Sequence, residues 1–160
     1  MTAFTAIEKR ANSLLASSHG GAYNVKNLTS SIELAAQATF PHTITFGYVP
    51  SNARLLGSST FSCDDLATST TTMDLGIAAV NGNLANADDP NGLSDAHAVT
   101  SAITGAAAIG NIADYGNFAW DFVASESVDP GGVLAITGTV QDALTTGTGT
   151  ITVSIDYVVD

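Results

Sequence analysis

The fold class follows from the C-terminal stretch Gly149-Thr150-Ile151-Thr152-Val153-Ser154-Ile155-Asp156-Tyr157-Val158-Val159-Asp160. Apolar side chains occupy every second position from residue 151 to residue 159, and Thr152, Ser154 and Asp156 lie between the first four of them. Because successive side chains of a β-strand point to opposite faces, this period of two is typical of a strand with one buried face. The stretch therefore predicts a half-buried strand.

Residues 30–36, 42–49, 72–80 and 117–123 alternate in the same way, and residues 52–63 and 132–142 do so more weakly, with interrupting glycines. Clusters of turn-forming residues at 50–52, 81–83, 88–92 and 129–132 separate these segments. We therefore predict an all-β protein, an antiparallel β-sandwich of about eight strands that is jelly-roll-like. The predicted domains are an N-terminal arm at residues 1–20 and the sandwich at residues 21–160. Its core face should include Ile44, Phe46, Tyr48, Phe118, Trp120 and Phe122.

The composition supports strands rather than helices. The 160 residues include 20 Thr and only 3 Glu, and 12% of them are charged. Thr favours strands, whereas Glu and Lys are typical of helix surfaces. The content of 45% hydrophobic residues is too high for an intrinsically disordered chain. The sequence contains no apolar run long enough to span a membrane.

The charges are strongly unbalanced, with 15 acidic residues against 4 basic ones and a net charge of −11. The basic residues are Lys9, Arg10, Lys26 and Arg54, so none follows residue 54. Such a surface repels phosphate backbones and anionic lipid, which argues against nucleic-acid and membrane partners. A protein, a neutral sugar or a cation is the expected partner.

A single cysteine, Cys63, excludes an intrachain disulfide, and its apolar neighbours predict a buried thiol. Glu8, Lys9 and Arg10 interrupt the N-terminus before any apolar stretch, so we expect no secretory signal and folding in a reducing cytoplasm.

We find no motif for catalysis or cofactor binding. His19, His42 and His97 lack metal-ligand spacing, and no Gly-x-Ser-x-Gly, Walker or dinucleotide motif occurs. Asp64 and Asp65 are expected in a turn that follows a strand. We therefore expect no catalytic residue and no cofactor, and a protein that is not an enzyme.

One acidic segment, residues 86–95, is a weak calcium candidate. Asp88, Asp89, Asn91 and Asp95 bring several hard oxygen ligands together, as Ca²⁺ requires. The spacing is not that of an EF-hand, and Pro90 interrupts it. A solvated turn is the favoured interpretation of the segment.

For some segments the sequence leaves two structures or two roles open. In the arm, Ile7, Ala11, Leu14 and Leu15 could line one helix face, or the arm is extended. Residues 101–114 form a short helix or a buried loop, and residues 145–150 are expected in a flexible turn. Trp120, with Phe118 and Phe122, could form an aromatic platform for a sugar, although a core role is the favoured one.

The chain resembles small virion structural proteins of tailed bacteriophages, in particular those of the decoration or cement type. The resemblance covers roughly residues 22–160. It rests on residues 49–57, 63–66 and 73–77, with the sequences Val-Pro-Ser-Asn-Ala-Arg-Leu-Leu-Gly, Cys-Asp-Asp-Leu and Met-Asp-Leu-Gly-Ile, and on the closing stretch quoted above.

The resemblance implies a jelly-roll-like protein on the exterior of the virion that binds the major capsid protein, often as a homotrimer at local three-fold positions. The arm, with Lys9, Arg10, Leu14 and Leu15, is the expected partner-binding segment. Two alternatives remain open: a tail, neck or fibre-base protein of the virion, and a carbohydrate-binding β-sandwich module.

Overall fold

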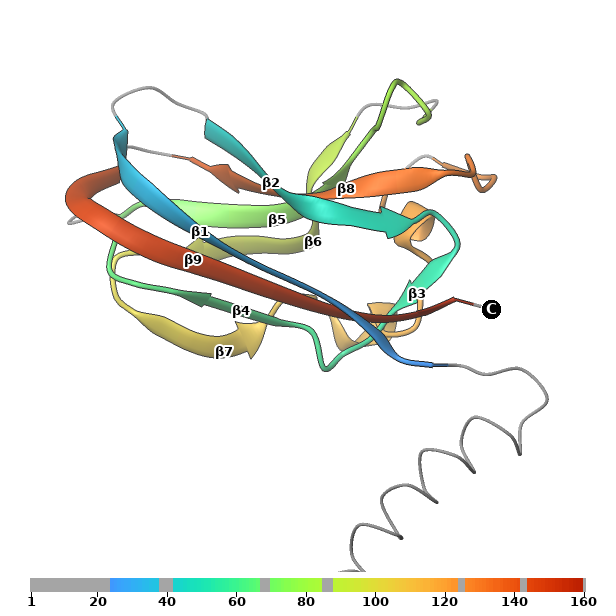
Figure 1. Cartoon of the computed structure of the whole chain (residues 1–160), viewed down its shortest axis with the longest axis horizontal. Helices are drawn as coiled ribbons and strands as arrows, with labels where there is room; N and C mark the ends of the chain where they lie inside the picture. The colour runs from blue at the N-terminus through green and yellow to red at the C-terminus, as the bar shows by residue number, and fades with distance from the viewer. Residues whose placement is uncertain are drawn as a thin grey trace, which may run out of the picture.

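Two antiparallel sheets face each other in the computed structural model (Figure 1), which describes residues 24–37, 42–66, 70–84, 88–123, 126–141 and 144–159. The first sheet has the order β1 (Lys26–Gln37), β9 (Leu144–Val159), β4 (Thr60–Cys63) and β7 (Ile103–Ala107). A short strand, β3 (Ala53–Leu55), also pairs with β9. The second sheet has the order β2 (His42–Pro50), β8 (Val133–Val140), β5 (Thr72–Ala78) and β6 (Asp89–Ala98).

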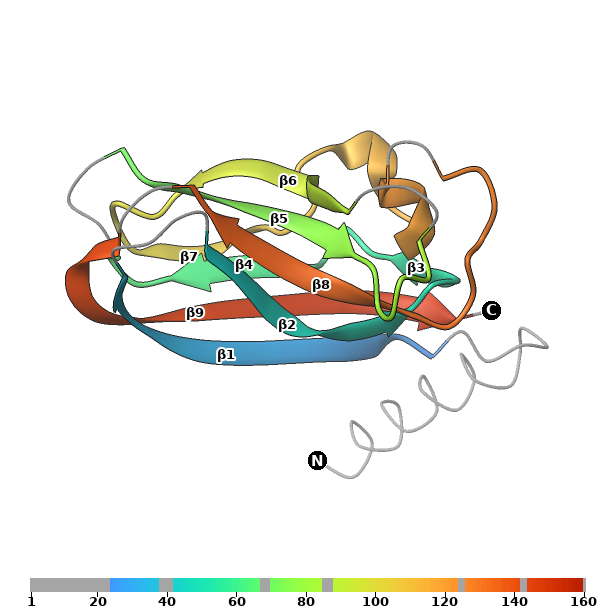
Figure 2. The ribbon, with the colours of Figure 1, turned by 90° about the horizontal axis from the view of Figure 1, so that it is seen from above.

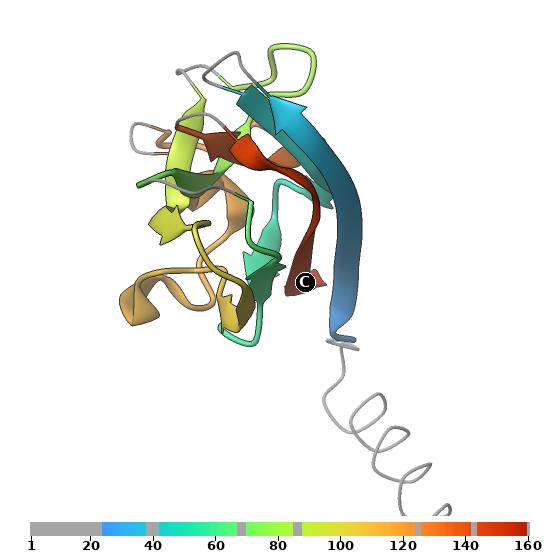
Figure 3. The ribbon, with the colours of Figure 1, turned by 90° about the vertical axis from the view of Figure 1, so that its left-hand side faces the viewer.

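The connections are those of a jelly roll. Both β3 and β4 pair with β9, so they occupy one strand position, and the fold has eight positions in two sheets of four. The chain changes sheet at every connection between these positions except the one from β5 to β6. Figure 3, which looks along the strands, shows the two layers, with β1 at the edge of the first. The predicted antiparallel sandwich is therefore confirmed.

The closing strand behaves as its sequence predicts. Ile151, Val153 and Ile155 of β9 are fully buried, whereas Thr152 and Ser154 between them are half-buried on the outer face. The core contains buried apolar residues from both sheets and from the loops that join them. Burial of such side chains, at about 25 cal/mol per Å² of apolar surface, is the main force that holds the sheets together.

Tyr48 was predicted to lie in the core, but a bulge in β2 places it on the outer face. The register between β2 and β8 shifts between Thr45 and Gly47, which exchanges the two faces of the strand beyond that point. Ile44 and Phe46 are buried as predicted, but Val49 then takes the core position and Tyr48 is 57% exposed.

The acidic segment is a strand with a wide bulge, and the predicted turn is wrong. Leu75 of β5 pairs with Ser94, and Ile77 pairs with Asp89, so the intervening residues of β6 bulge outward. Pro90 lies in this bulge, where a missing ladder hydrogen bond is tolerated. A Cβ at Gly76 would lie 2.1 Å from the Asp89 carbonyl oxygen, so the bulge depends on glycine at that position.

Residues 117–123 are likewise not a strand. They contain the 3₁₀ helix η2 (Ala119–Phe122), and the Asp121 carboxylate accepts a hydrogen bond from the Phe118 N–H at 3.0 Å. Ala119 and Phe122 are therefore buried, whereas Phe118 and Trp120 are only partly buried. The predicted inward face of three aromatic residues is wrong for Phe118, whereas Trp120 packs against the core while remaining partly buried.

Two further segments differ from expectation. Residues 101–114 contain β7 and the 3₁₀ helix η1 (Ile112–Asp114), rather than a longer helix or a buried loop. Residues 145–150 belong to β9, rather than to a flexible turn. Gly149 serves packing there, because a Cβ would lie 2.3 Å from a methyl group of Leu66.

Candidate interaction surfaces

Exposed apolar side chains gather at one end of the sandwich, which we call the apolar end. Here β1 begins, β9 ends, and η1 and η2 join β7 to β8 (Figure 2). It consists of Val25, Ile112, Tyr115, Val128 and Val133, together with the partly buried Phe118 and Trp120. Ile112 is 78% exposed and Val128 is 71% exposed, which is unusual for large aliphatic side chains.

A layered group of side chains supports the apolar end. The guanidinium carbon of Arg54 lies 3.9 Å from the centroid of the Phe118 ring, and the Phe118 and Trp120 rings stack with centroids 6.2 Å apart. Arg54 also donates a hydrogen bond to the Gly116 carbonyl oxygen at 3.1 Å. Because Arg54 lies over the Phe118 ring and the Trp120 ring stacks against it, the Phe118 ring is not the open platform that stacking on a sugar needs.

Three carboxylates belong to the segments that carry these apolar residues. Asp121 caps η2 as described above, Asp129 accepts a hydrogen bond from the Gly131 N–H at 2.8 Å, and Asp114 lies in η1. Backbone N–H groups thus hold the carboxylates of Asp121 and Asp129, and the Asn117 side-chain amide donates to the Asp114 carboxylate at 3.5 Å. The apolar end thus carries both exposed apolar side chains and carboxylates.

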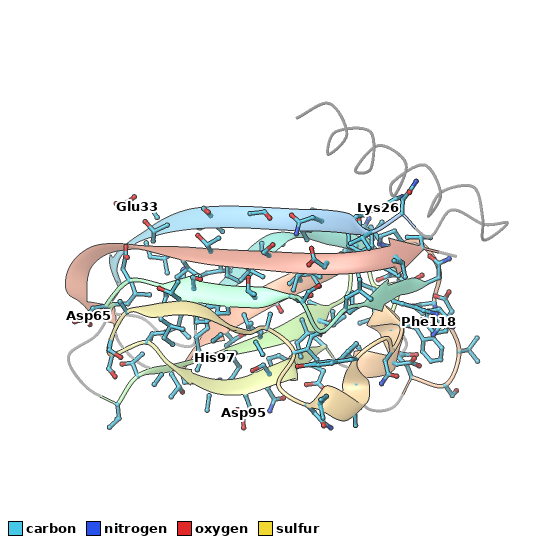
Figure 4. The ribbon with its side chains drawn as sticks, turned by 90° about the horizontal axis from the view of Figure 1, so that it is seen from below. Lys26, Glu33, Asp65, Asp95, His97 and Phe118 are labelled. Carbon is cyan, nitrogen blue, oxygen red and sulfur yellow. The ribbon has the colours of Figure 1, made fainter. Side chains whose placement is uncertain are left out.

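The opposite end of the sandwich, which we call the polar end, carries different residues. Figure 4 places Glu33 and Asp65 at this end, far from Lys26 and Phe118 at the apolar end. Asp64 and Asp65 follow β4, as predicted, and the Asp64 carboxylate accepts a hydrogen bond from the Thr150 N–H at 2.8 Å. Cys63 beside them is buried, as predicted, and burial raises the pKa of its thiol.

The outer face of the first sheet forms a network of short polar side chains, which we call the hydroxyl face. Asn27 donates a hydrogen bond to the Ser154 hydroxyl at 2.8 Å, and the hydroxyls of Ser31 and Thr152 lie 2.8 Å apart. The Thr29 and Ser154 hydroxyls lie 3.1 Å apart. These side chains bond one another across β1 and β9, so little rotamer freedom remains for them to lose on contact with a partner.

The calcium candidates do not converge on one point. The Asp88 carboxylate accepts a hydrogen bond from the Ala79 N–H at 2.8 Å, and the Asp89 carboxylate faces the Asn91 N–H at 3.3 Å. Asn91 and Asp95 instead line an open depression of about 360 Å³ with Asn111 and Asp114. Within the described ranges, no group of three or more His, Cys, Asp or Glu side chains has the arrangement of a metal site. Calcium binding stays a prediction.

His97 forms the described pair that most resembles catalytic machinery. Its Nε2 lies 2.7 Å from the Ser94 hydroxyl, and its ring stacks on the buried Phe61 ring with centroids 4.7 Å apart. Burial lowers the pKa of His97, and the Asp74 carboxylate partly opposes this shift. Burial thus favours the neutral form of the imidazole.

Asp74 does not complete a triad. Its buried carboxylate accepts hydrogen bonds from the Ala96 N–H, at 2.9 Å, and from the Gln141 side-chain amide. These bonds fix Ala96, whose φ of 58° is uncommon outside glycine, and tie β5 to β6 and to the end of β8. The cluster therefore serves the structure of the second sheet.

The predicted arm residues Lys9, Arg10, Leu14 and Leu15 lie outside the described residues, as does His19. The proposed boundary between residues 20 and 21 therefore stays a prediction. Neither helix among the described residues is long and apolar enough to cross a bilayer.

The apolar end was not among the sites predicted from the sequence. A signal was present at Val128 and Val133, which flank the turn at residues 129–132, where apolar side chains rarely find a core. Ile112 and Tyr115 gave no such signal, because their exposure depends on the course of the long connection from β7 to β8.

The fold and its surfaces define a double-sheet jelly-roll protein. No family model and no curated protein matches the chain. Among solved structures, a chain of the capsid asymmetric unit of cyanophage Pam1 is similar, with 24% sequence identity and a TM-score of 0.60. The likeness covers 86% of each chain. At this identity it shows that the two chains share a fold.

Proposed function

We propose that this chain is a structural protein of a phage virion, and specifically a decoration or cement protein that binds the outside of the shell formed by the major capsid protein. The likeness to a chain of a phage capsid, over 86% of both chains, is the observation that carries the proposal. The sequence resemblance to virion proteins of tailed phages supports it.

The surface chemistry also supports this role. The short hydroxyl side chains of the hydroxyl face lose little conformational entropy on burial, so they suit close packing between subunits. The net charge of −11 suits the exterior of a shell and is unsuited to contact with packaged DNA.

The apolar end is the surface that we assign to the shell. The start of β1 at Lys26 lies at this end, so the arm and the apolar patch reach the same partner (Figure 4). Lys9, Arg10, Leu14 and Leu15 of the arm would add basic and apolar contacts. Three copies at a local three-fold position would each present this end to neighbouring capsid subunits.

The mechanism is stabilisation by mass action, without catalysis or a cofactor. A protein that binds across neighbouring subunits of the intact shell, and not across separated ones, raises the free energy of rupture by RT ln(1 + [L]/Kd). The side-chain contacts of Ser94, His97 and Asp74, which bond within the sandwich, are consistent with a structural role.

The test uses shells from a phage whose gene for this chain is deleted. Addition of the purified chain should restore decoration and raise the temperature at which shells rupture. Removal of residues 1–20 should abolish decoration while the sandwich stays folded, because the buried core lies within residues 34–155. Shells that bind none of the full chain would contradict the proposal, and copies at one vertex only would favour the tail or neck alternative.

A further inference from the structure

The strand β1 leaves one edge of the first sheet open among the described residues. It pairs with β9 along one side, from Lys26 opposite Tyr157 to Ala35 opposite Thr148, without interruption. Along its other side it pairs with no described strand, and Figure 3 shows it at the margin of its layer. An open edge presents a row of backbone N–H and C=O groups that can pair with another strand.

The other three edges of the sandwich carry features that oppose pairing with a further strand. The edge strand β6 contains Pro90, a wide bulge and the exposed Asp95. The edge strand β2 ends at Pro50, and its register shifts at an internal bulge. The edge strand β7 is only 5 residues long and contains Gly105 with a φ of 65°. Prolines, bulges, charges and short length are the means by which natural sheets keep their edges unpaired.

The strand β1 lacks these features over most of its length. It is 12 residues long and contains neither proline nor glycine, and its register shifts only near its end, between Ala35 and Gln37. Its charged residues are Lys26 and Glu33, which lie toward opposite ends of the strand (Figure 4). Of the four edges that the structure describes, β1 is therefore the one best suited to receive another strand.

Charge favours a second copy of β1 as that strand. The chain has 15 acidic residues against 4 basic ones, so most contacts between two copies bring like charges together. The charges of β1, by contrast, sum to zero. When two copies pair in antiparallel orientation, the Lys26 end of each β1 lies beside the Glu33 end of the other, so opposite charges approach each other.

The alternation of side chains selects one register for this pairing. Leu28, Ser30 and Ile32 are half-buried toward the core, whereas Thr29 and Ser31 are exposed on the hydroxyl face. Directly opposite residues of an antiparallel pair point to the same face. A two-fold axis at Ser30 sets Leu28 opposite Ile32 of the second copy, and Thr29 opposite Ser31 of the second copy. Apolar side chains then meet apolar ones, whereas an axis at Thr29 or at Ser31 would set Ser30 opposite Leu28 or Ile32.

We propose that two copies of this chain pair through β1 in antiparallel orientation, with a two-fold axis at Ser30, so that their first sheets join into one continuous sheet. Backbone hydrogen bonds across the pair supply the affinity, and the alternating side chains fix the register. This inference goes beyond the proposed function and does not require shell binding. On a shell, the contact links copies that occupy neighbouring positions.

An exchange of charges on the exposed face of β1 tests the pairing in the purified full-length protein. The wild type should sediment as a dimer. Thr29→Lys/Ser31→Lys and Thr29→Glu/Ser31→Glu should each sediment as monomers, because the register sets like charges opposite each other. An equimolar mixture of the two variants should restore the dimer, since each Lys then lies opposite a Glu. The control Thr104→Lys, on the exposed edge strand β7 of the same sheet, should leave the dimer intact.

Urea denaturation of each double variant separates loss of pairing from loss of folding, because a folded monomer keeps a cooperative transition. A wild type that stays monomeric at submillimolar concentration would overturn the proposal. So would an assembly of two or more copies whose mass both double variants retain.

A disulfide reports the register directly and needs only a conservative substitution. Ser30→Cys places two thiols opposite each other at the axis, where the Cα atoms of an antiparallel pair lie about 4.5–5.5 Å apart, within the range of a disulfide. Oxidation should therefore give a crosslinked dimer, since the native Cys63 is buried. In the matched control Ser31→Cys the two thiols are diagonal neighbours, about 7–8 Å apart at Cα, and should crosslink far less. Equal crosslinking of the two variants, or no crosslink with Ser30→Cys, would contradict the pairing.

Discussion

The two ends of the sandwich share one core but present opposite surfaces. At the polar end, the side chains of Glu33, Asp64 and Asp65 are exposed on or directly after strands whose inner faces are buried. At the apolar end, aliphatic side chains such as Ile112 and Val128 are exposed beside the equally well buried Leu55. The shared core therefore does not account for the exposure of apolar groups at one end, which the proposed function assigns to recognition of a partner.

We expect the largest losses of stability from substitutions in the shared core, and we expect them to be similar at the two ends. Leu55 at the apolar end and Leu66 at the polar end are 0% and 1% exposed. Leu55→Ala and Leu66→Ala should each reduce the free energy of unfolding by about 2–5 kcal/mol, because each leaves a cavity. Urea denaturation measures both, and a loss at one end only would break the picture of a shared core.

Substitutions of two glycines, Gly76 and Gly149, should differ in how much stability they cost. At Gly76 a Cβ meets the backbone of Asp89 and Pro90, so Gly76→Ala should destabilise the protein by about 1–3 kcal/mol. At Gly149 the obstacle is a methyl group of the Leu66 side chain, which can turn away. Gly149→Ala should therefore cost less than about 1 kcal/mol. Thermal unfolding of the two variants tests the difference, which equal costs would exclude.

Polar contacts at the two ends should contribute less. Arg54→Met removes the contact with the Phe118 ring and the hydrogen bond to Gly116, and should cost about 1–2 kcal/mol. Asp64→Ala removes the acceptor of the Thr150 N–H at an exposed site and should cost about 0.5–1 kcal/mol. Urea denaturation midpoints of the two variants measure these losses of stability. A larger loss for Asp64→Ala than for Arg54→Met would contradict the prediction.

The smallest effect concerns pH and lies between the two ends, at His97. Burial lowers the pKa of His97 in the folded state, so the unfolded chain takes up this proton more readily. The stability that neutral His97 contributes is complete above the ordinary imidazole pKa of about 6.5 and falls as pH decreases through that value toward the folded pKa. The urea midpoint of the wild type should fall more between about pH 7.5 and about pH 5.5 than that of His97→Gln. An equal fall of the urea midpoint in the wild type and in His97→Gln would contradict the assignment of this pH dependence to His97.

Sequence patterning predicted the sandwich because most of its strands are amphipathic with a regular period of two. The closing strand β9 is the clearest case, where Ile151, Val153 and Ile155 lie in the core as expected. The predictions for Tyr48 and for residues 88–95 were wrong because bulges shift the register, and bulges depend on contacts between distant strands. The bulge of β6 requires Gly76 on β5, a contact that local sequence does not reveal.

The candidate site was less predictable than the fold. Alternation placed Phe118 and Trp120 in the core, but the Asp121 cap turns residues 119–122 into a 3₁₀ helix and leaves both rings near the surface. Ile112 and Val128 are exposed because the long connection between β7 and β8 returns over the end of the sandwich. The path of this connection depends on tertiary packing, so the periodicity of the sequence could not predict it.

The most direct test of the central claim is the orientation of this chain on the particle, determined by cryo-electron microscopy of phage virions that contain it. The account predicts copies arrayed over the outer surface of the shell, with Ile112 and Val128 in contact with capsid subunits and with Glu33 and Asp65 facing solvent. Copies that contact the shell through Glu33 and Asp65, with the apolar end exposed, would contradict it.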